Sequence, residues 1–258
     1  MSNILAIFSK DVRSYFSSMT AYVLTTIFLI LSGFFFSSAV SYFSFYSFQL
    51  SSQPFLAQQG LNLTEAVIGN LFFNMSVILL LMMPILTMRT LAEEQKQGTF
   101  ELLMTYPVTE SELVWGKFLS TLFVFGAMLL PTLAHLLLLK IVGGNFEWGV
   151  VLTSYLGIVL LGVAFLALGI FASSLTENQI ISAVITFGFL LMLWMIAWLN
   201  EFLPPETAAW ANDFSLIRHL EDFFKGVVEL RHVVYYLLLS GFFLLLTIWR
   251  LESRRWVR

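Results

Sequence analysis

The chain has 258 residues, of which 59% are hydrophobic and only 11% charged, and its formal net charge is -3. A soluble globular domain carries about 25% charged residues, so this composition excludes that class and indicates a membrane protein. The chain has no cysteine, which excludes disulfides and thiolate metal sites, and nothing in it suggests nucleic-acid binding.

Several apolar stretches are long enough to cross a bilayer as helices, because a hydrocarbon core of about 30 Å needs about 20 apolar residues. They lack the alternation that is typical of barrel strands. Their ranges are 20–45, 68–88, 118–139, 149–173, 179–199 and 233–249. The predicted fold is an all-α integral membrane protein with six transmembrane helices, in which residues 1–258 form one domain.

The N-terminal segment, residues 1–18, is predicted to form an amphipathic helix that lies in the membrane interface. Lys10 and Arg13 fall outside its apolar stripe, and a frayed terminus is the alternative. The apolar stripe consists of Ile4, Ile7, Phe8, Val12, Tyr15 and Phe16. The apolar stretch that follows has about 26 residues, too many for the apolar region of a cleaved signal peptide.

The first span combines small and aromatic residues. Gly33, Ser37 and Ser41 recur at four-residue spacing, which lets another helix approach closely. Phe36 and Tyr42 belong to an aromatic outer half that fits either an interfacial belt or a path for an amphipathic substrate. These five residues are candidates for a pathway or a dimer interface.

The loop at residues 89–117 is longer than the two to eight or so residues that a plain connection needs. Leu91–Gln97 should continue as a helix with Glu93, Glu94 and Lys96 exposed, and Gly98 should supply a turn. We expect a docking element here, with a solvated connector as the alternative.

Two more helices are expected in this loop. Thr99 can cap a short helix with Phe100, Leu103 and Met104 on its apolar face, which Pro107 ends. Thr109 and Glu112 form a capping box, with Val108 and Leu113 as a hydrophobic staple, so a further helix should begin there and run into the third span.

Two later spans have local features of their own. Pro131 should kink the third span, because proline removes a backbone donor. His135 lies on the same helix, where an ionisable residue is a functional hypothesis, although a structural role is favoured. Gly162, Gly169 and Ser173 give the fourth span a face of small residues.

The loop at residues 200–232 should contain an amphipathic helix that ends near Gly226. Arg218, His219, Glu221, Asp222 and Lys225 are expected on its polar face. The opposite, apolar face consists of Leu216, Ile217, Leu220, Phe223, Phe224 and Val227.

The positions of lysine and arginine predict the orientation. With a cytoplasmic N-terminus, nine of the thirteen fall in inner segments and four in outer loops, which favours both termini inside. Residues 89–117 would then be cytoplasmic and residues 200–232 extracytoplasmic.

The sequence carries none of three common catalytic motifs. The chain has no G-x-x-x-x-G-K-[ST] loop for ATP, no H-E-x-x-H and no G-x-S-x-G, so we expect no catalytic residue, metal site or bound cofactor. An ion-coupled carrier that works alone is disfavoured, because its spans hold almost no charged residues.

The segment EEQKQGTFELLMTYPVTESELVWGKF resembles the region after the second span of ABC-2 type exporter permeases, where an acid pair, Gly-Thr, Glu-Leu-Leu, Pro and Gly-Lys recur in that order. The tail from FSLIRHLEDFFKG to RLESRRW resembles the gliding-motility (GldF-like) branch of this family. With the N-terminal KDVRSYF, the resemblance covers essentially the whole chain.

The resemblance implies a type V ABC exporter-like plan. Lys10 and Arg13 would belong to a connecting helix at the cytoplasmic interface. Extracytoplasmic helices between spans five and six would form an outer gate with Arg218, His219, Glu221 and Asp222. A coupling helix would dock on the ATPase through Glu93, Glu94, Lys96, Gly98, Thr99, Phe100, Glu101 and Leu103.

The function implied is that of a permease subunit in the bacterial inner membrane, paired with a second permease copy or a homologue and with two ABC ATPase subunits. ATP and Mg²⁺ would be used by the ATPase, so this chain would not itself be an enzyme. The alternative is a complex that transmits force or a signal to an extracytoplasmic partner protein without moving a solute.

Overall fold

A computed structural model describes residues 3–52, 63–99, 108–199, 204 and 213–256. Within these ranges the chain is helical and contains no strand. Six helices of the described residues are long and apolar enough to cross a membrane, the number predicted from the apolar stretches of the sequence. They cover Met19–Gln49, Ala66–Lys96, Glu110–Ile141, Trp148–Leu175, Gln179–Trp198 and Leu230–Ser253.

The first part of the chain forms α1 (Asn3–Ser17), the 34-residue α2 (Met19–Ser52), a π-helical turn η1 (Thr64–Gly69), α3 (Asn70–Thr87) and the short α4 (Ala92–Lys96). The second part forms α6 (Glu110–Leu129), a 3₁₀ turn η2 (Leu130–Thr132), α7 (Leu133–Ile141), α8 (Trp148–Leu175), α9 (Gln179–Leu199), α11 (Leu216–Phe224) and α12 (Leu230–Trp256).

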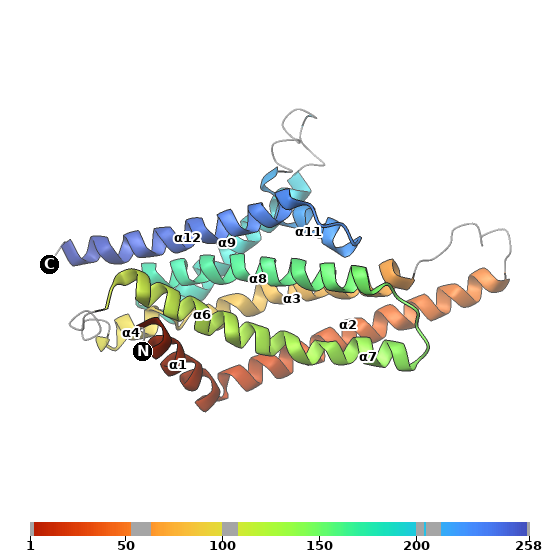
Figure 1. Ribbon diagram of the computed structural model, residues 1–258, viewed down its shortest axis with the longest axis horizontal. Helices are drawn as coiled ribbons and strands as arrows, with labels where there is room; N and C mark the ends of the chain where they lie inside the picture. Colours follow the sequence, from red (N-terminus) through yellow and green to blue (C-terminus); the bar gives the residue numbers. More distant parts are fainter. Residues whose placement is uncertain (1–2, 53–62, 100–107, 200–203, 205–212, 257–258) are drawn as a thin grey trace.

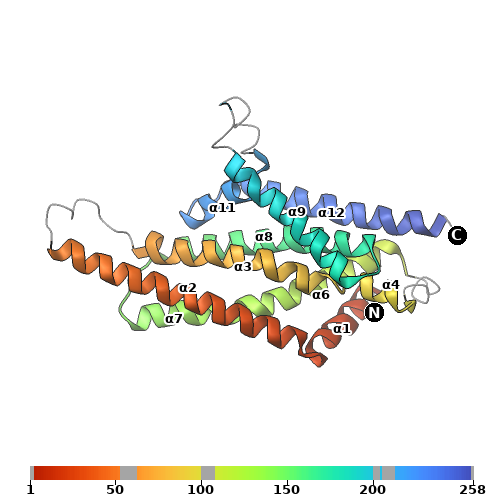
Figure 2. The ribbon, with the colours of Figure 1, turned by 180° about the vertical axis from the view of Figure 1, so that it is seen from behind.

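The long helices form an elongated bundle. In Figures 1 and 2, α2, α3, α6 with α7, α8 and α12 run along the long axis, whereas α9 crosses them at an angle. The helices α1 and α4 lie together at the end of the bundle where α12 also finishes. We call this the α1–α4 end.

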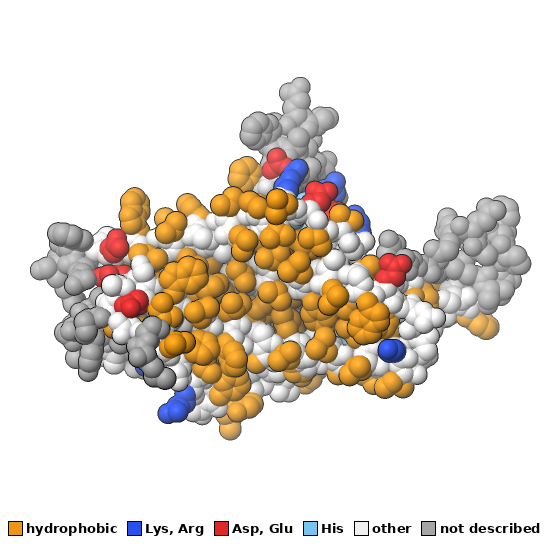
Figure 3. Space-filling model, in the orientation of Figure 1, with side chains coloured by type: hydrophobic (Ala, Val, Ile, Leu, Met, Phe, Trp, Pro, Cys, Tyr) orange, Lys and Arg blue, Asp and Glu red, His pale blue; other side chains and the backbone are white. Residues whose placement is uncertain are grey.

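The core lies around α8. In the most apolar stretch of α8, 78% of the residues are buried, compared with 17% in α2 and 22% in α9. Apolar side chains cover the middle of the face in Figure 3, and charged side chains gather towards its margins. This band fits a protein whose middle is surrounded by lipid.

Small residues of α8 allow neighbouring helices to pack closely, as its pattern predicted. A Cβ atom on Gly162 would lie 2.2 Å from the Phe125 ring of α6, and one on Gly169 would lie 2.1 Å from Thr87 Oγ1 of α3. Since real Cβ atoms do not approach this closely, both contacts require glycine.

The features of the first span have separate environments. Gly33 faces His135 of α7, and Phe36 packs against the His135 ring with centroids 5.2 Å apart. Ser37 and Ser41 are exposed, and Tyr42, at 58% exposure, contacts Tyr46. Within one chain, only part of the predicted small-residue face therefore meets another helix.

The third span is broken where Pro131 predicts, because α6 ends at Leu129 and η2 separates it from α7. The capping box of α6 is confirmed: Thr109 Oγ1 accepts from the Glu112 amide, and Glu112 Oε2 accepts from the Thr109 amide at 2.9 Å. Gly98 adopts φ +69°, as the predicted turn requires.

Candidate functional site

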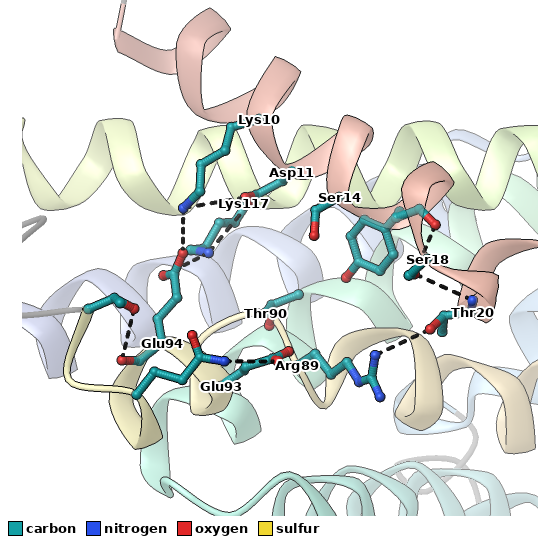
Figure 4. A pocket seen from close by; sticks show the side chains of 13 residues that line it. Lys10, Asp11, Ser14, Ser18, Thr20, Arg89, Thr90, Glu93, Glu94 and Lys117 are labelled. Atoms are coloured by element: carbon teal, nitrogen blue, oxygen red, sulfur yellow. Dashed lines mark hydrogen bonds and ion pairs between the residues drawn. The ribbon is translucent and has the colours of Figure 1, made fainter.

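The α1–α4 end contains a polar cavity of about 460 Å³, where α1, α4 and the start of α6 meet (Figure 4). Charged side chains from all three helices point into it. Its described lining residues are Lys10, Asp11, Ser14, Tyr15, Ser18, Thr20, Arg89, Thr90, Glu93, Glu94, Gln97, Thr99 and Lys117.

Four of these side chains form what we call the ionic cluster: Lys10 and Asp11 of α1, Glu94 of α4 and Lys117 of α6. Lys117 Nζ lies 2.9 Å from Glu94 Oε2 and 3.4 Å from Asp11 Oδ2. Lys10 Nζ lies 3.0 Å from the other oxygen of Glu94. One carboxylate therefore holds two ammonium groups from two different helices.

Three of the four side chains of the ionic cluster are largely shielded from solvent, whereas the fourth, Lys10, is 59% exposed. The side chain of Lys117 is 3% exposed, and those of Glu94 and Asp11 are 13% and 14% exposed. Burial lowers the pKa of Lys10, but the carboxylates of Glu94 and Asp11 outweigh it, and the pKa is raised overall. The pairs that Lys117 makes with Glu94 and Asp11 are shielded on both sides, so they resist separation more strongly than exposed pairs do.

The prediction that Glu94 is exposed is wrong. A pair of acids at the start of a short helix usually faces water, but Glu94 is turned towards Lys117, which belongs to another helix. Glu93 is half-buried and its carboxylate accepts a hydrogen bond from Gln97. Lys96 is exposed, as predicted.

A glycine explains how α1 reaches this position. A Cβ atom on Gly116 would lie 2.8 Å from the Ile7 side chain, so α1 packs directly on α6 at this point. Asn3 strengthens the contact by donating to Glu112 Oε2 at 3.0 Å. The two residues of the Gly-Lys motif therefore act together: Gly116 leaves room for α1 to pack against α6, and Lys117 forms an ion pair with Asp11 of α1.

α1 and the start of α2 are also joined to the end of α3. The Tyr15 hydroxyl of α1 donates to the carbonyl of Leu86 at 3.0 Å, and Arg89 Nη1, just after α3, donates to Thr20 Oγ1 of α2 at 3.2 Å. Burial and the nearby Asp11 carboxylate raise the pKa of Tyr15, so its hydroxyl remains a donor. Arg13, the other basic residue singled out in α1, is exposed.

Ser173 of α8 binds the backbone that leads into α4. Its hydroxyl oxygen accepts from the amides of Leu91 and Ala92, both at 3.0 Å, and the hydroxyl donates to the carbonyl of Met88 at 3.3 Å. These amides would otherwise be unsatisfied at the start of a helix. The central helix of the bundle is thereby attached to α4.

Of the other residues predicted for this site, Gly98 and Thr99 follow α4, and the Thr99 hydroxyl donates to the carbonyl of Glu94 at 3.3 Å. Phe100, Glu101 and Leu103 lie outside the described residues. Sequence reasoning missed Asp11, Tyr15, Lys117 and Ser173 as site residues. For Lys117 the signal was its Gly-Lys pair, placed directly before an apolar span.

The helix predicted in residues 200–232 is present as α11, which is followed by Gly226 at φ +86°. Arg218 and Glu221 form an exposed ion pair with a distance of 3.7 Å. The placement of His219 on the polar face is wrong, because His219 is 2% exposed. Val227, expected on the apolar face, lies beyond the helix end and is 47% exposed.

Comparison with known proteins identifies the family. No curated protein matches the chain. The sequence profile of the ABC-2 family transporter proteins matches residues 5–235, a range that includes both the ionic cluster and α11. The chain therefore belongs to the ABC-2 family of transporter proteins.

Proposed function

We propose that this chain is the permease subunit of an ATP-driven exporter, and that the segment around α4 and Gly98 is the coupling element on which a separate ATPase subunit acts. Members of the ABC-2 family are membrane transport subunits and normally work with an ABC ATPase subunit. ATP and Mg²⁺ would be bound by that ATPase.

The observation that carries this proposal is the ionic cluster. A coupling element must pass a displacement on to the membrane helices instead of yielding to it. Glu94 fixes α4 to α6 through the buried Lys117 and to α1 through Lys10. A push on α4 would therefore move α1 and α6 together with it.

The contacts of Ser173 extend the same connection to the core. Because this side chain of α8 binds the Met88 carbonyl and the Leu91 amide, the end of α3, the start of α4 and α8 are held at one point. A rigid-body movement of α4 would reach the centre of the bundle without passing through a flexible loop.

The exposed apolar surface supports a two-copy assembly. Most residues in the apolar stretches of α2 and α9 are not buried within one chain. We propose that a second permease copy, or a homologous chain, covers part of this surface, that the pathway lies between the two copies and that two ATPase subunits dock beneath. The α1–α4 end would face the cytoplasm of a bacterial inner membrane.

The test is co-purification of the ATPase with tagged permease from the native membrane, measured as Mg²⁺-dependent ATP hydrolysis. Phe100→Ala, in the coupling segment, should abolish co-purification but leave membrane insertion intact. Phe45→Ala is the matched control, because Phe45 lies on α2 and is 63% exposed. Retention of the ATPase by Phe100→Ala would contradict docking on this segment.

A second variant separates docking from transmission. Since Glu94 is bound inside the chain, Glu94→Gln should retain the ATPase but lose the coupling of hydrolysis to substrate in reconstituted vesicles. Loss of the ATPase from this variant would mean that Glu94 contacts the partner directly. If an extracytoplasmic protein stimulates ATP hydrolysis and no cargo moves, that result would instead favour a complex that transmits force.

A further inference from the structure

A second group of titratable side chains lies where α11 meets the start of α12. His219 of α11 and His232 of α12 are both buried, at 2% and 5% exposure. Their Nδ1 atoms are 2.6 Å apart, and the His219 ring stacks on Tyr235 with centroids 4.1 Å apart. The two rings therefore join the helices through a direct nitrogen-to-nitrogen hydrogen bond.

The outer nitrogen of each ring has a partner that fixes its proton. His219 Nε2 lies 3.0 Å from the backbone carbonyl of Asp213, and His232 Nε2 lies 3.0 Å from Asp222 Oδ2. A carbonyl and a carboxylate can only accept hydrogen bonds, so each Nε2 must carry a hydrogen. Lys225, 3.8 Å from the other oxygen of Asp222, is a charge partner for that carboxylate.

The proton count of the pair follows from these contacts. Two Nδ1 atoms at 2.6 Å form a hydrogen bond only if one of them also carries a hydrogen. The four ring nitrogens then hold three hydrogens, whereas two neutral imidazoles would hold two. We propose that His219 and His232 form a binding site for one proton, and that this proton fastens α11 to α12 and makes their packing dependent on pH.

The surrounding charges indicate which ring is the cation. Two carboxylates face His232, Asp222 at 3.0 Å and Glu229 at 3.5 Å. Burial lowers the pKa of His219, and its neighbour Arg231 acts in the same direction. His232 is therefore the imidazolium and donates from both nitrogens, and neutral His219 accepts at Nδ1.

Among the side chains that the structure describes, the other elements packed against the pair supply few charges. Asp213, before α11, is paired with Arg231. Tyr235 and Tyr236 use their hydroxyls to bind the carbonyls of Phe214 and Leu216. α8 faces α11 with the uncharged Thr153, Ser154 and Gly157. The described side chains of α3 and α9 include no titratable group. Arg218 and Glu221 pair with each other on the exposed side of α11.

The sign of the pH effect follows from the proton count. When pH rises and the shared proton leaves, two lone pairs oppose each other at the Nδ1 atoms, so the contact weakens. When pH falls and a second proton binds, two N–H groups and two positive charges face each other, and the contact weakens again. The packing of α11 should be tightest between the two macroscopic pKa values of the pair.

Weakening of this contact would act on the core of the bundle. Thr153 of α8 donates to the Phe223 carbonyl at 2.8 Å, and a Cβ atom on Gly157 would lie 2.8 Å from Phe223. Because α11 lies this close to α8, its release would uncover a face of the central helix. The proton thus controls access to that face.

The first test is hydrogen exchange of α11 amides in the full chain in lipid nanodiscs, from about pH 5 to about pH 9, a range that brackets the ordinary histidine pKa. After correction for intrinsic exchange rates, protection should pass through a maximum and fall at least about tenfold towards high pH. A flat profile would overturn the proposal.

Variants on the same helices sharpen this test. His232→Gln keeps a donor for Asp222 but cannot titrate, so α11 protection should lose its pH dependence. Glu221→Gln, in the exposed pair beside Arg218, is the matched control and should keep the wild-type profile. A wild-type profile in His232→Gln would also overturn the proposal.

A second measurement counts the protons directly and does not depend on the folding of a variant at the pair. The chain has three histidines, so ¹⁵N-histidine labelling gives few signals, and His135→Gln identifies the third ring. At the pH of greatest protection, three of the four nitrogens of His219 and His232 should be protonated. A count of two would refute the shared proton.

Discussion

Removing the Glu94 carboxylate tests the ionic cluster most directly. Glu94→Gln would leave the Lys117 ammonium buried with Asp11, at 3.4 Å, as its remaining carboxylate partner. Loss of one member of a buried ion pair costs about 3–5 kcal/mol. Since Asp11 stays, we expect the lower end, about 3 kcal/mol.

This loss can be measured by thermal unfolding in detergent. For a chain of this size, 1 kcal/mol shifts the Tm by about 2–4 °C, so Glu94→Gln should lower the Tm by about 6–12 °C. Glu93→Gln is the matched control on the same helix and should stay within about 0.5 kcal/mol of the wild type, because Glu93 bonds only to the exposed Gln97 in the described structure.

A double-mutant cycle isolates the interaction itself. Lys117→Met removes the buried cation, so adding Glu94→Gln to it should cost much less than Glu94→Gln costs alone. Additive losses in the double variant, or an unchanged Tm in Glu94→Gln, would refute the buried interaction between α4 and α6.

Three further substitutions test the packing and backbone contacts. Gly169→Ala should destabilise the protein by about 1–3 kcal/mol in the thermal assay, because the added methyl group clashes with α3. Gly126→Ala is the control and should be neutral or stabilising, because nothing lies within 4 Å of its added Cβ atom. Equal losses of stability in the two variants would contradict the close contact between α8 and α3. Ser173→Ala leaves two backbone amides without their acceptor and should cost about 1–3 kcal/mol of stability. Ser174→Ala should cost less, because the Ser174 hydroxyl bonds within its own helix. A larger loss of stability in Ser174→Ala than in Ser173→Ala would exclude the proposed attachment of α4. Thr109→Ala removes the cap of α6 and should lower stability by about 0.5–2 kcal/mol. Amide hydrogens in the first turn of α6 should exchange faster in this variant. Unchanged exchange rates would speak against the cap.

Local patterns predicted the features that depend on neighbouring residues in the chain. Span number follows from apolar length, the break in the third span from Pro131, and the start of α6 from Thr109 and Glu112. The proline and capping effects act within about one helical turn, and the span number depends only on a contiguous run of about 20 residues, so the sequence alone carries the necessary information.

The misplaced residues depend on partners from distant segments. The residue type of Glu94 is typical of an exposed helix start, and only the approach of α6 brings Lys117 to it. His219 falls among polar residues of α11, but its environment is set by His232 and Tyr235 on the next helix. Periodicity describes one helix at a time and cannot assign such pairs.

The length of α2 sets how this chain meets the bilayer boundary. A 34-residue helix is about 51 Å long, and at the steepest usual tilt of about 40° it still rises about 39 Å, compared with a hydrocarbon thickness of about 30 Å. One end must stand clear of the acyl chains by several ångströms. If the N-terminal end of α2 is held beside α1, its C-terminal end projects beyond the acyl chains. This end carries Tyr46 and Phe48, which are 41% and 74% exposed and would lie among the lipid headgroups.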